Sequence, residues 1–392
     1  MRIVMITGDD LASFRGGTIH LMEQAENLVA RGHDVQIIAQ DRGAYPQQTT
    51  VRIRYLPAWG SGALRLLSYN VSLLFVLLWL GLRRWPQIIH TRQMGYSATP
   101  LFVSTLLRLP HVLEVNGVLR DELAGQAPSR SRLWAIDFFS RLNLHRSDRF
   151  TTTTTGYLRR LEQVYDVDET SWRPMPCGVN PDLFRPADQQ AARARLQVPK
   201  DVFALLHVGS LYDWRGLDVL LEALAQVQGS LPPWELWLVG DGVETPRLQQ
   251  QSQDLDLTDR VRFVGQVSYN EVPHWLAAAD VGVVLYKPTR PVPGDPMKIY
   301  EYMASGLPVM AGDHPHYGGI VADAAAGVVV DDTDPRALAE AVTRLAADGE
   351  ARGQMASRGV DVARTQYSWA RRAEDLERLF LELLPARSQE TT

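Results

Sequence analysis

The chain has 392 residues, more than one compact core usually holds and about right for two domains of ordinary size. Apolar residues make up 45% and charged residues 22% of it, proportions that are typical of a globular protein and exclude long disordered tracts. The net charge of -5 excludes the broad positive field by which proteins hold DNA or RNA, so we expect no nucleic-acid partner.

The first half alternates short aliphatic runs with longer helical segments, a pattern that predicts a parallel sheet covered by helices on both faces. We predict strands at residues 2–7, 35–39, 51–56, 87–91, 111–115 and 149–153. The first apolar run is too short, and too soon followed by acidic residues, to be a signal peptide, so we predict no export.

The most apolar segment, Val71–Leu82, is shorter than the ~20 residues that cross a bilayer. Because Arg65, Arg83 and Arg84 flank it, two interpretations stay open: a core helix packed on the sheet, which we favour, or a helix resting on anionic lipid. The single cysteine, Cys177, fits a reducing compartment. We therefore expect a cytoplasmic protein, with peripheral contact at the inner face of the plasma membrane under the second interpretation.

The second half repeats the α/β pattern, with predicted strands at residues 203–208, 235–239, 261–264, 281–285, 308–311 and 327–330. Four prolines within residues 174–186 indicate a stiff connector between the halves. We predict a first domain over residues 1–180, a second over 181–365, and a C-terminal helix within 366–392 that packs back on the first domain. Two such doubly wound domains are expected to face each other across a cleft at the carboxyl ends of their strands, where ligands bind.

The sharpest motif is the segment Gly294–Pro308, which predicts a short helix with recognisable ends. Asp295 is the expected N-cap, Pro296 suits the first helical position, and Gly306 can take the left-handed conformation that ends a helix.

The start of this helix predicts an anion site. Free backbone N–H groups and the positive end of the helix dipole attract phosphate, and Lys298 adds a full charge one turn in. Glu301, about a turn further along, can accept hydrogen bonds from a ribose diol. The alternative is an exposed ion pair between Lys298 and Glu301, which the mostly apolar and aromatic neighbours disfavour.

Two glycine-containing loops follow predicted strands. Gly209-Ser210 lets backbone approach a phosphate, and Arg215 can offer it a planar guanidinium fork. In the first half, Gly16-Gly17 precedes a helix but lacks the GxGxxG spacing, which disfavours a dehydrogenase.

Seven blocks in the right order resemble family 4 of the retaining glycosyltransferases, which have the GT-B fold of two Rossmann-like domains. The blocks are Arg15–Gly17 with His20 and Arg31–Val35, Val112–Gly117, Gly178–Phe184, Val208–Ser210 with Arg215–Asp218, Leu238–Gly242, Val261–Gly265, and Lys298–Gly306. The resemblance implies transfer from a nucleotide diphosphate sugar, UDP- or GDP-linked, with retention of anomeric configuration and without a metal or other cofactor.

The resemblance also assigns residues. It implies that Glu301 holds the ribose, that Lys298 with the adjacent backbone faces the phosphates, and that Arg215 replaces the family's usual lysine. The remaining residues assigned to donor binding are Gly16, Gly17, Gly209, Ser210, Gly240, Gly265, Val267, Pro296 and Met297.

Three positions depart from the family pattern. Ser210 replaces a second basic residue, Pro293 replaces the first glutamate of a spaced pair, and Asn116 replaces an active-site histidine. Asp295 is expected to take over sugar contacts from the missing glutamate, while Asn116 can donate and accept hydrogen bonds without titrating near neutral pH. On the acceptor side we name five candidates, which are Arg15, Arg92, Glu114, Arg120 and Glu122.

The reaction implied is front-face attack in which the leaving phosphate takes the acceptor's proton, so we name no nucleophile. The residues that we assign to catalysis are Asn116, Arg215, Lys298 and Asp295. We expect transfer of a hexose-type sugar to a glycan, lipid-linked or small-molecule acceptor, as in polysaccharide biosynthesis. Two other classes stay open: a noncatalytic nucleotide-sugar-binding subunit, and a nucleotide-sugar epimerase or hydrolase.

We predict no metal site in this sequence. The nine histidines have no zinc-ligand spacing, the loop at His314-Pro315-His316 is too short for one, and Asp331–Asp334 is interpreted as helix capping.

Overall fold

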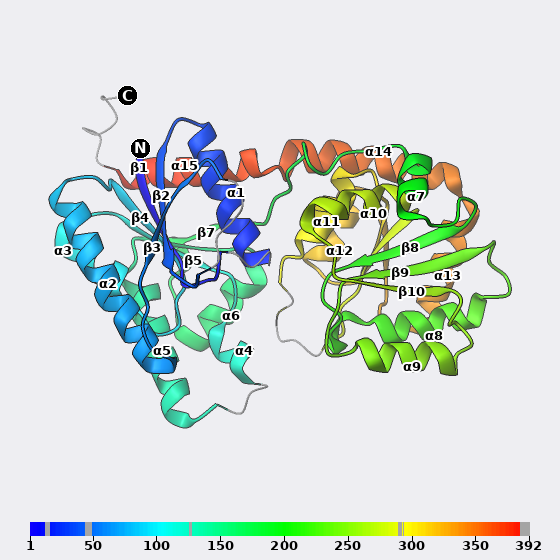
Figure 1. The fold of residues 1–392 in the computed structure, drawn as a ribbon, viewed down its shortest axis with the longest axis horizontal. Helices are drawn as coiled ribbons and strands as arrows, with labels where there is room; N and C mark the ends of the chain where they lie inside the picture. Colours follow the sequence, from blue (N-terminus) through cyan, green and yellow to red (C-terminus); the bar gives the residue numbers. More distant parts are fainter. Residues whose placement is uncertain (12–15, 44–48, 125–127, 289–291, 293, 385–392) are drawn as a thin grey trace. The chain divides into compact units, whose positions relative to one another are not determined.

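The computed structural model describes residues 1–11, 16–43, 49–124, 128–288, 292 and 294–384, which form two α/β units (Figure 1). Unit 1 comprises Met1–Cys177 together with Trp369–Thr392, and unit 2 comprises Gly178–Ser368. The sequence predicts the first boundary between residues 180 and 181, and the units divide between Cys177 and Gly178, inside the proline-rich connector.

A seven-stranded parallel sheet forms the centre of unit 1, in the order β3-β2-β1-β4-β5-β6-β7. Its strands are β1 (Arg2–Ile6), β2 (Asp34–Gln40), β3 (Arg52–Leu56), β4 (Ile88–Arg92), β5 (His111–Val115), β6 (Arg149–Thr152) and β7 (Trp172–Pro174). The strand order reverses between β1 and β4. Doubly wound sheets bind ligands at the carboxyl ends of the strands beside such a reversal, so the loops after β1 and β4 occupy the expected position.

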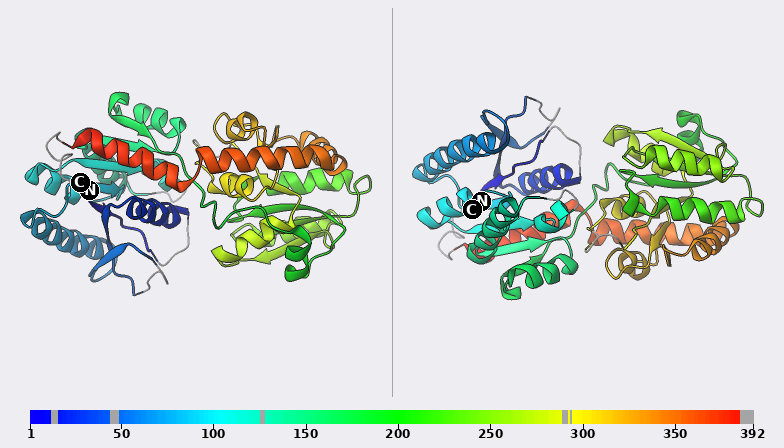
Figure 2. Two further views of the ribbon diagram at one scale, coloured as in Figure 1. Left: turned by 90° about the horizontal axis from the view of Figure 1, so that it is seen from above. Right: turned by 90° about the horizontal axis from the view of Figure 1, so that it is seen from below.

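Helices cover both faces of this sheet (Figure 2). They are α1 (Gly16–Ala30), α2 (Gly62–Leu82), α3 (Thr99–Leu107), α4 (Leu119–Ala124), α5 (Arg130–Arg146), α6 (Thr155–Tyr165) and α15 (Trp369–Leu383). Because side chains alternate along a strand, Ile3 and Met5 join a core with α1 and α15, whereas Val4 and Ile6 join a core with α2 and α3. The strand β1 thus contributes side chains to the cores on both faces of the sheet.

The sheet of unit 2 has six parallel strands in the order β10-β9-β8-β11-β12-β13, with the reversal between β8 and β11. The strands are β8 (Phe203–Val208), β9 (Trp234–Val239), β10 (Val261–Gly265), β11 (Val281–Val284), β12 (Val309–Gly312) and β13 (Gly327–Val330). The helices are α7 (Gln189–Leu196), α8 (Leu217–Val227), α9 (Thr245–Asp254), α10 (Val272–Ala278), α11 (Met297–Ala304), α12 (Tyr317–Asp323), α13 (Pro335–Ala347) and α14 (Gly349–Gln366).

Two elements differ from the sequence predictions. The strand β7 was not predicted, because it has three residues and ends in Pro174; a proline is tolerated there since β7 is the edge strand. The apolar helix is longer than the predicted Val71–Leu82, since α2 begins at Gly62.

The C-terminal helix α15 packs against α1 in unit 1 (Figure 2). Its buried residues Ala373, Leu376 and Phe380 complete the core on that face of the sheet. Glu377 accepts hydrogen bonds from Arg31 and lies 2.8 Å from His33 Nε2 at the end of α1. The end of the chain is therefore part of the first unit.

Candidate functional site

Three of the predicted glycines lie at the carboxyl ends of neighbouring strands in unit 2. Gly209 follows β8, Gly240 follows β9 and Gly265 ends β10, and all three have positive φ. The Gly240 N–H donates to the Gly265 carbonyl at 2.8 Å, and a Cβ on Gly240 would collide with the carbonyl oxygen of Gly209. Only glycine allows this backbone geometry at low cost, so the edge of the sheet is unobstructed by side chains here.

Cationic groups converge beside this edge. Lys298, in the first turn of α11, is buried, and its Nζ lies 3.5 Å from His207 Nε2. A Cβ on Gly209 would lie 3.0 Å from the same Nζ. Burial, and then the charge of Arg215, lower the pKa of Lys298 well below its usual value, while Glu301 acts in the opposite direction. The site therefore brings two basic side chains together at a point enclosed by protein, where the charge of Arg215 opposes protonation of Lys298.

The Arg215 guanidinium packs against two aromatic rings. Its Cζ is 3.9 Å from the ring centroid of Trp214 and 4.7 Å from that of Tyr286. Its Nε and Nη1 are buried, and neither has a hydrogen-bond partner among the described residues. Because a buried donor without an acceptor is costly, these atoms indicate a place where an external acceptor binds.

Ion pairs fix the turn that carries Arg215. This turn is the 3₁₀ helix Asp213–Arg215, which ends at Gly216 with positive φ. Lys287 Nζ lies 3.0 Å from Asp213 Oδ1 and 2.6 Å from Asp218 Oδ2, and the Lys287 N–H donates to the Trp214 carbonyl at 2.9 Å. The loop after β11 therefore holds the loop after β8 in place.

Glu301 lies one turn after Lys298 on α11 and is 7% exposed. Its Oε1 accepts a hydrogen bond from the Tyr269 hydroxyl at 3.2 Å. Tyr269 begins the 3₁₀ helix that follows β10, so the loop containing half-buried Val267 lies near Glu301. The structure thus brings the residue predicted to hold a ribose together with the loop of Val267, which is also predicted to bind the donor.

Asp295 does not cap α11 as the sequence predicts. The helix begins at Met297 with Pro296 as its N-cap residue, and no side chain caps it. The buried Asp295 carboxylate instead accepts from the Tyr300 hydroxyl at 2.7 Å and lies 3.1 Å from His316 Nε2. Tyr300, five residues further along, can reach back to Asp295 because Pro296 turns the chain before the helix starts.

The other predicted residues near α11 differ in exposure. Pro296 is buried, Met297 is half-buried and Ser210 is exposed. Pro293 lies outside the described residues, so its predicted departure from the family pattern stays a prediction.

A buried charged cluster occupies the reversal point of unit 1. Glu114, at the end of β5, is 1% exposed. It lies 3.1 Å from Arg92 Nη1, 3.6 Å from His20 Nδ1 and 3.6 Å from His90 Nε2. Burial alone would raise the pKa of Glu114, but His20, Arg92 and His90, with a hydrogen bond from Asn116, hold it at about 2. The carboxylate is therefore charged and surrounded by donors.

Glu114 orients Asn116, which the sequence predicts in the position of a histidine. The Asn116 amide Nδ2 donates to Glu114 Oε1, and its buried Oδ1 has no hydrogen-bond partner among the described residues. An acceptor atom is thus presented in a fixed direction. The predicted contact of Glu114 itself with an acceptor stays a prediction, and the contacts that the structure shows are with protein groups.

Arg92 explains why Gly17 is a glycine. Arg92 Nη1 donates to the Gly17 carbonyl at 3.0 Å, and a Cβ on Gly17 would lie 2.5 Å from Arg92 Nη2. Arg92 also pairs with Asp9 at 2.8 Å. Gly16 is the exposed first residue of α1, and Arg15 lies outside the described residues.

Two other acceptor-side candidates lie on α4. Arg120 pairs with Asp137 of α5 at 2.6 Å and is half exposed. Glu122 is exposed, and a Cβ on Gly117 would collide with its carboxylate. Of the predicted acceptor-side residues, the structure brings together Arg92 and Glu114 with Asn116, while Arg120 makes a surface pair.

Sequence reasoning missed four residues of these sites. His207, Tyr269, Trp214 and His316 contact or stack against predicted residues. His207 sits two positions before Gly209 at the end of a predicted strand, which is a usable signal. Trp214 adjoins Arg215 in the sequence, whereas Tyr269 and His316 contact residues far away in the sequence, and no spacing rule indicates such pairs.

The aspartates at 331–334 are structural. Asp331 accepts from the Thr333 N–H, Asp334 caps α13 through the Arg336 N–H, and Asp332 accepts from the Tyr286 N–H at 2.8 Å. Among the described residues, no group of three or more His, Cys, Asp or Glu side chains is placed to hold a metal ion.

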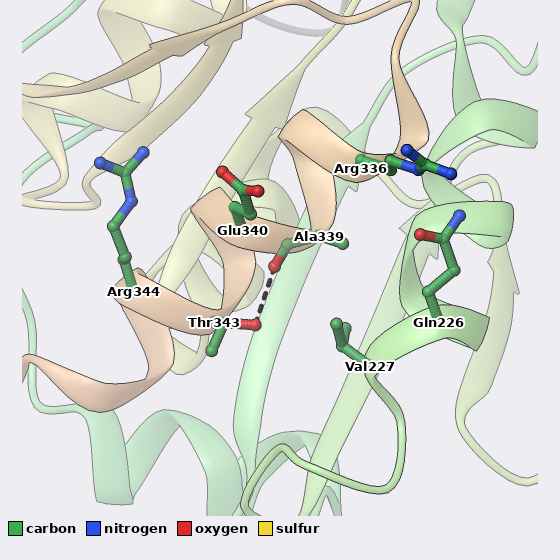
Figure 3. Close-up of a pocket in the computed structure, with 7 residues that line it drawn as sticks. All are labelled: Gln226, Val227, Arg336, Ala339, Glu340, Thr343 and Arg344. Carbon is green, nitrogen blue, oxygen red and sulfur yellow. Dashed lines mark hydrogen bonds between the residues drawn. The ribbon is translucent and has the colours of Figure 1, made fainter.

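A surface depression of unit 2 lies between α8 and α13 (Figure 3). It is lined by Gln226, Val227, Arg336, Ala339, Glu340, Thr343 and Arg344. None of the predicted site residues lines it, and it is separate from the site at α11.

Two family models account for most of the chain. The model described as Glycosyltransferase Family 4 matches residues 14–183, and the model described as Glycosyl transferases group 1 matches residues 188–361. The chain belongs to this glycosyltransferase family. The two matches meet near the division between the units. Together they include Gly209, Gly240 and Gly265, the helix α11 and the Glu114 cluster.

Curated relatives include D-inositol 3-phosphate glycosyltransferases and a lipopolysaccharide enzyme. The enzyme of Nocardioides sp. is 32% identical over 239 residues, which are 57% of this chain and 51% of the relative. That of Acidothermus cellulolyticus is 27% identical and covers 79% of this chain and 70% of the relative. The lipopolysaccharide core biosynthesis glycosyltransferase LpsE of Rhizobium meliloti is 31% identical and covers 50% of this chain and 53% of the relative. The chain spans about half the length of most of these curated relatives.

Solved structures show the fold. Sucrose-phosphate synthase of Thermosynechococcus elongatus superposes with a TM-score of 0.77 at 23% identity, covering 97% of this chain and 98% of the other. HepE of Anabaena in complex with UDP-glucose has a TM-score of 0.75 at 18% identity, and the match covers 97% of this chain and 99% of the other. The predicted GT-B class, with two parallel α/β sheets, is confirmed.

Proposed function

We propose that this chain is a retaining glycosyltransferase that moves a hexose-type sugar from a UDP- or GDP-linked donor to a glycan, lipid-linked or small-molecule acceptor in the cytoplasm. Membership of the family supports the transferase class. The donor, the acceptor and the stereochemical course are part of the proposal.

The observation that carries the proposal is the pair of enclosed basic side chains, Lys298 and Arg215, in unit 2. Lys298 is buried beside Gly209, and Arg215 has two buried donors without partners among the described residues. A diphosphate placed at the start of α11 supplies the missing acceptors and negative charge. Glu301, one turn further along, then accepts hydrogen bonds from the ribose, with Tyr269 fixing its orientation.

These groups also suit the chemical step. As the bond from sugar to phosphate breaks, negative charge grows on the leaving diphosphate, and preorganised cations stabilise that charge most in a site sheltered from water. Lys298 and Arg215 supply this stabilisation from side chains, and the chemistry proposed here uses no metal ion. Asp295 contributes by anchoring Tyr300 of α11, since its carboxylate is enclosed by protein.

On the acceptor side, the proposal assigns Asn116 as the hydrogen-bonding group. Its Oδ1 is a buried acceptor with no partner among the described residues, and Glu114 holds its amide. In front-face attack the departing phosphate takes the proton of the acceptor hydroxyl, so Asn116 needs to orient that hydroxyl and not to ionise.

Nucleotide release from a panel of UDP and GDP sugars tests the proposal. The purified chain is incubated with each donor, with and without glycan, lipid-linked and inositol phosphate acceptors. Release that depends on an acceptor, together with an axial or equatorial product linkage matching the donor, supports retaining transfer. Tight binding without turnover for every pair would instead assign the chain to a noncatalytic binding role. Release to water alone would indicate a hydrolase.

A further inference from the structure

The helix α2 carries a continuous apolar face that the rest of unit 1 leaves exposed. Apart from Leu66, which is 36% exposed, the exposed large apolar residues described in α2 recur at intervals of three or four, which places them along one side of the helix. They are Leu64, Leu67, Val71, Phe75, Trp79 and Leu82. Phe75 is 67% exposed and Leu82 is 81% exposed, so most of the surface of these two side chains faces solvent. Apolar side chains scattered singly on a surface are ordinary, but a stripe of this length marks a contact surface.

The neighbouring helix α3 extends this surface. It packs against α2 (Figure 1), and Leu107 of α3 lies where a Cβ on Gly81 of α2 would be. Phe102 and Leu106, one turn apart on α3, are 59% and 58% exposed. The six residues of α2 and these two residues of α3 are called the α2–α3 face below.

The segment of the chain that carries the α2–α3 face has charged residues of one sign only. Residues 42–113 contain eight arginines and no aspartate or glutamate, although the whole chain has a net charge of -5. Arg83, Arg84 and Arg108 are exposed, and none has an acidic side chain within 4.0 Å among the described residues. The segment thus attracts a negatively charged partner and offers no acidic group to a basic one.

Arginine and tryptophan meet at the C-terminal end of α2. The Cζ atoms of Arg83 and Arg54 lie 4.0 and 5.0 Å from the ring centroid of Trp79. An amphipathic ring flanked by guanidinium groups suits the boundary between lipid headgroups and acyl chains, where one end is apolar and the other polar.

The opposite side of α2 fixes the helix to the sheet. Tyr69, Leu73 and Leu77 are buried in a core with β1, and the Tyr69 hydroxyl donates to the Thr7 carbonyl at 2.9 Å. By length and composition alone, residues Leu64–Leu82 could cross a bilayer, with 22% of that span buried. If α2 spanned a membrane, these residues would have to leave the core. The helix α2 can therefore contact a membrane only through its exposed side, lying parallel to the membrane surface.

We propose that the α2–α3 face docks on an anionic lipid bilayer as a monotopic membrane-binding surface. The apolar stripe enters the headgroup boundary, and the arginines contact acidic headgroups such as those of the inner face of the plasma membrane. A bilayer fits the face because it presents apolar matter and negative charge together. Membrane binding uses no sugar and no residue of unit 2, so this inference stands apart from the proposed transferase activity.

Flotation of the purified full chain with lipid vesicles tests the inference. Vesicles of phosphatidylglycerol and phosphatidylethanolamine are expected to carry the chain at low salt, and phosphatidylcholine vesicles to carry at least tenfold less. The double variant Leu67→Ser with Phe75→Ser is expected to lower the vesicle-bound fraction at least tenfold, since it removes two inserted side chains. The pair Arg83→Gln with Arg84→Gln is expected to lower it severalfold and to reduce its dependence on salt.

The matched control is Val243→Ser, which changes an apolar residue of unit 2 that is 75% exposed and is expected to leave flotation unchanged. Far-UV circular dichroism and nucleotide binding in solution confirm that each variant is folded. Absence of flotation with both vesicle types would overturn the proposal. So would dimers that form without lipid and dissociate on the Leu67 and Phe75 substitutions, because the face would then belong to a second copy of the chain.

Discussion

The two units balance their buried charges in different ways. In unit 1, Glu114 is surrounded by His20, Arg92 and His90, so the cluster is neutralised by the protein itself. In unit 2, the charge of Arg215 opposes protonation of the buried Lys298, and Glu301 favours it. A buried acid enclosed by basic groups holds its surroundings in place, whereas two basic side chains close together favour the binding of an anion. Under the proposed function, unit 1 therefore positions the acceptor and unit 2 binds the phosphates.

The largest effect is expected from Glu114→Ala. Removal of this buried carboxylate takes away the acidic group that His20, His90 and Arg92 share and leaves Arg92 paired with Asp9, and breaking a buried charged cluster costs about 3–5 kcal/mol. Urea denaturation, followed by the near-UV circular dichroism, should show the loss of unfolding free energy. Glu169→Ala, which changes an exposed glutamate of the same unit, should cost under about 0.5 kcal/mol. Equal stability of the two variants would contradict the structural role of the cluster.

Arg215→Ala is expected to lower turnover more than donor binding. The side chain should act on charge that develops as the bond breaks, and loss of one such group costs about 2.7–4 kcal/mol in kcat. Steady-state kinetics with calorimetric donor affinity separates the two effects. Arg336→Ala, on the exposed surface of α13, serves as the control. A variant that loses donor affinity while keeping kcat would assign Arg215 to ground-state binding only.

Glu301→Ala is expected to weaken nucleotide binding by about 1.5–3 kcal/mol, or about 10-fold to 100-fold, the range for a charge-assisted hydrogen bond. Tyr269→Phe should have a smaller effect of about 0.5–1.5 kcal/mol, because it removes only the hydroxyl that orients the carboxylate. Calorimetric titration with UDP and GDP measures both, with Glu340→Ala on the outer surface as control. Unchanged affinity in a folded Glu301 variant would remove the ribose assignment.

The smallest effect is proton uptake on binding. Burial, with the charge of Arg215, lowers the pKa of Lys298, so between this lowered pKa and the ordinary lysine pKa the free site holds a neutral amine. A bound diphosphate favours the charged form and raises the pKa, so binding in that pH range takes up a proton. Calorimetry in buffers of different ionisation enthalpy measures the uptake. Lys298→Met should abolish it, and equal uptake in that variant would place the proton elsewhere.

The sequence predicts most of the strands and the glycines that follow or end three of them. Parallel strands are buried on both faces, so they appear as short aliphatic runs, and residues 111–115, 203–208 and 327–330 are predicted to the residue. Gly209, Gly240 and Gly265 are each predicted as loop residues, and the strand order then brings them side by side.

Contacts distant in sequence were beyond prediction. Asp295 looks like an N-cap because local spacing cannot reveal His316, which approaches it from the start of α12. For Glu114, the sequence does not show that His20, from α1, and His90, from β4, enclose it, and its acceptor-side role stays a prediction. The sequence left two interpretations of α2 open for a related reason: an apolar helix does not indicate which of its faces another element covers.

Because α15 belongs to unit 1 but follows unit 2 in the chain, unit 1 is completed only after unit 2 has been synthesised. Trp369 lies 5.0 Å from the ring of His20, and Phe380 lies 5.8 Å from the ring of His90, so the last helix made closes the cluster that the first strands begin. On the ribosome, residues 178–368 emerge in full before that closing helix exists. The second unit can therefore finish folding while the first still lacks part of its interior, and premature termination before residue 369 would leave the earlier half of the polypeptide open to proteolysis.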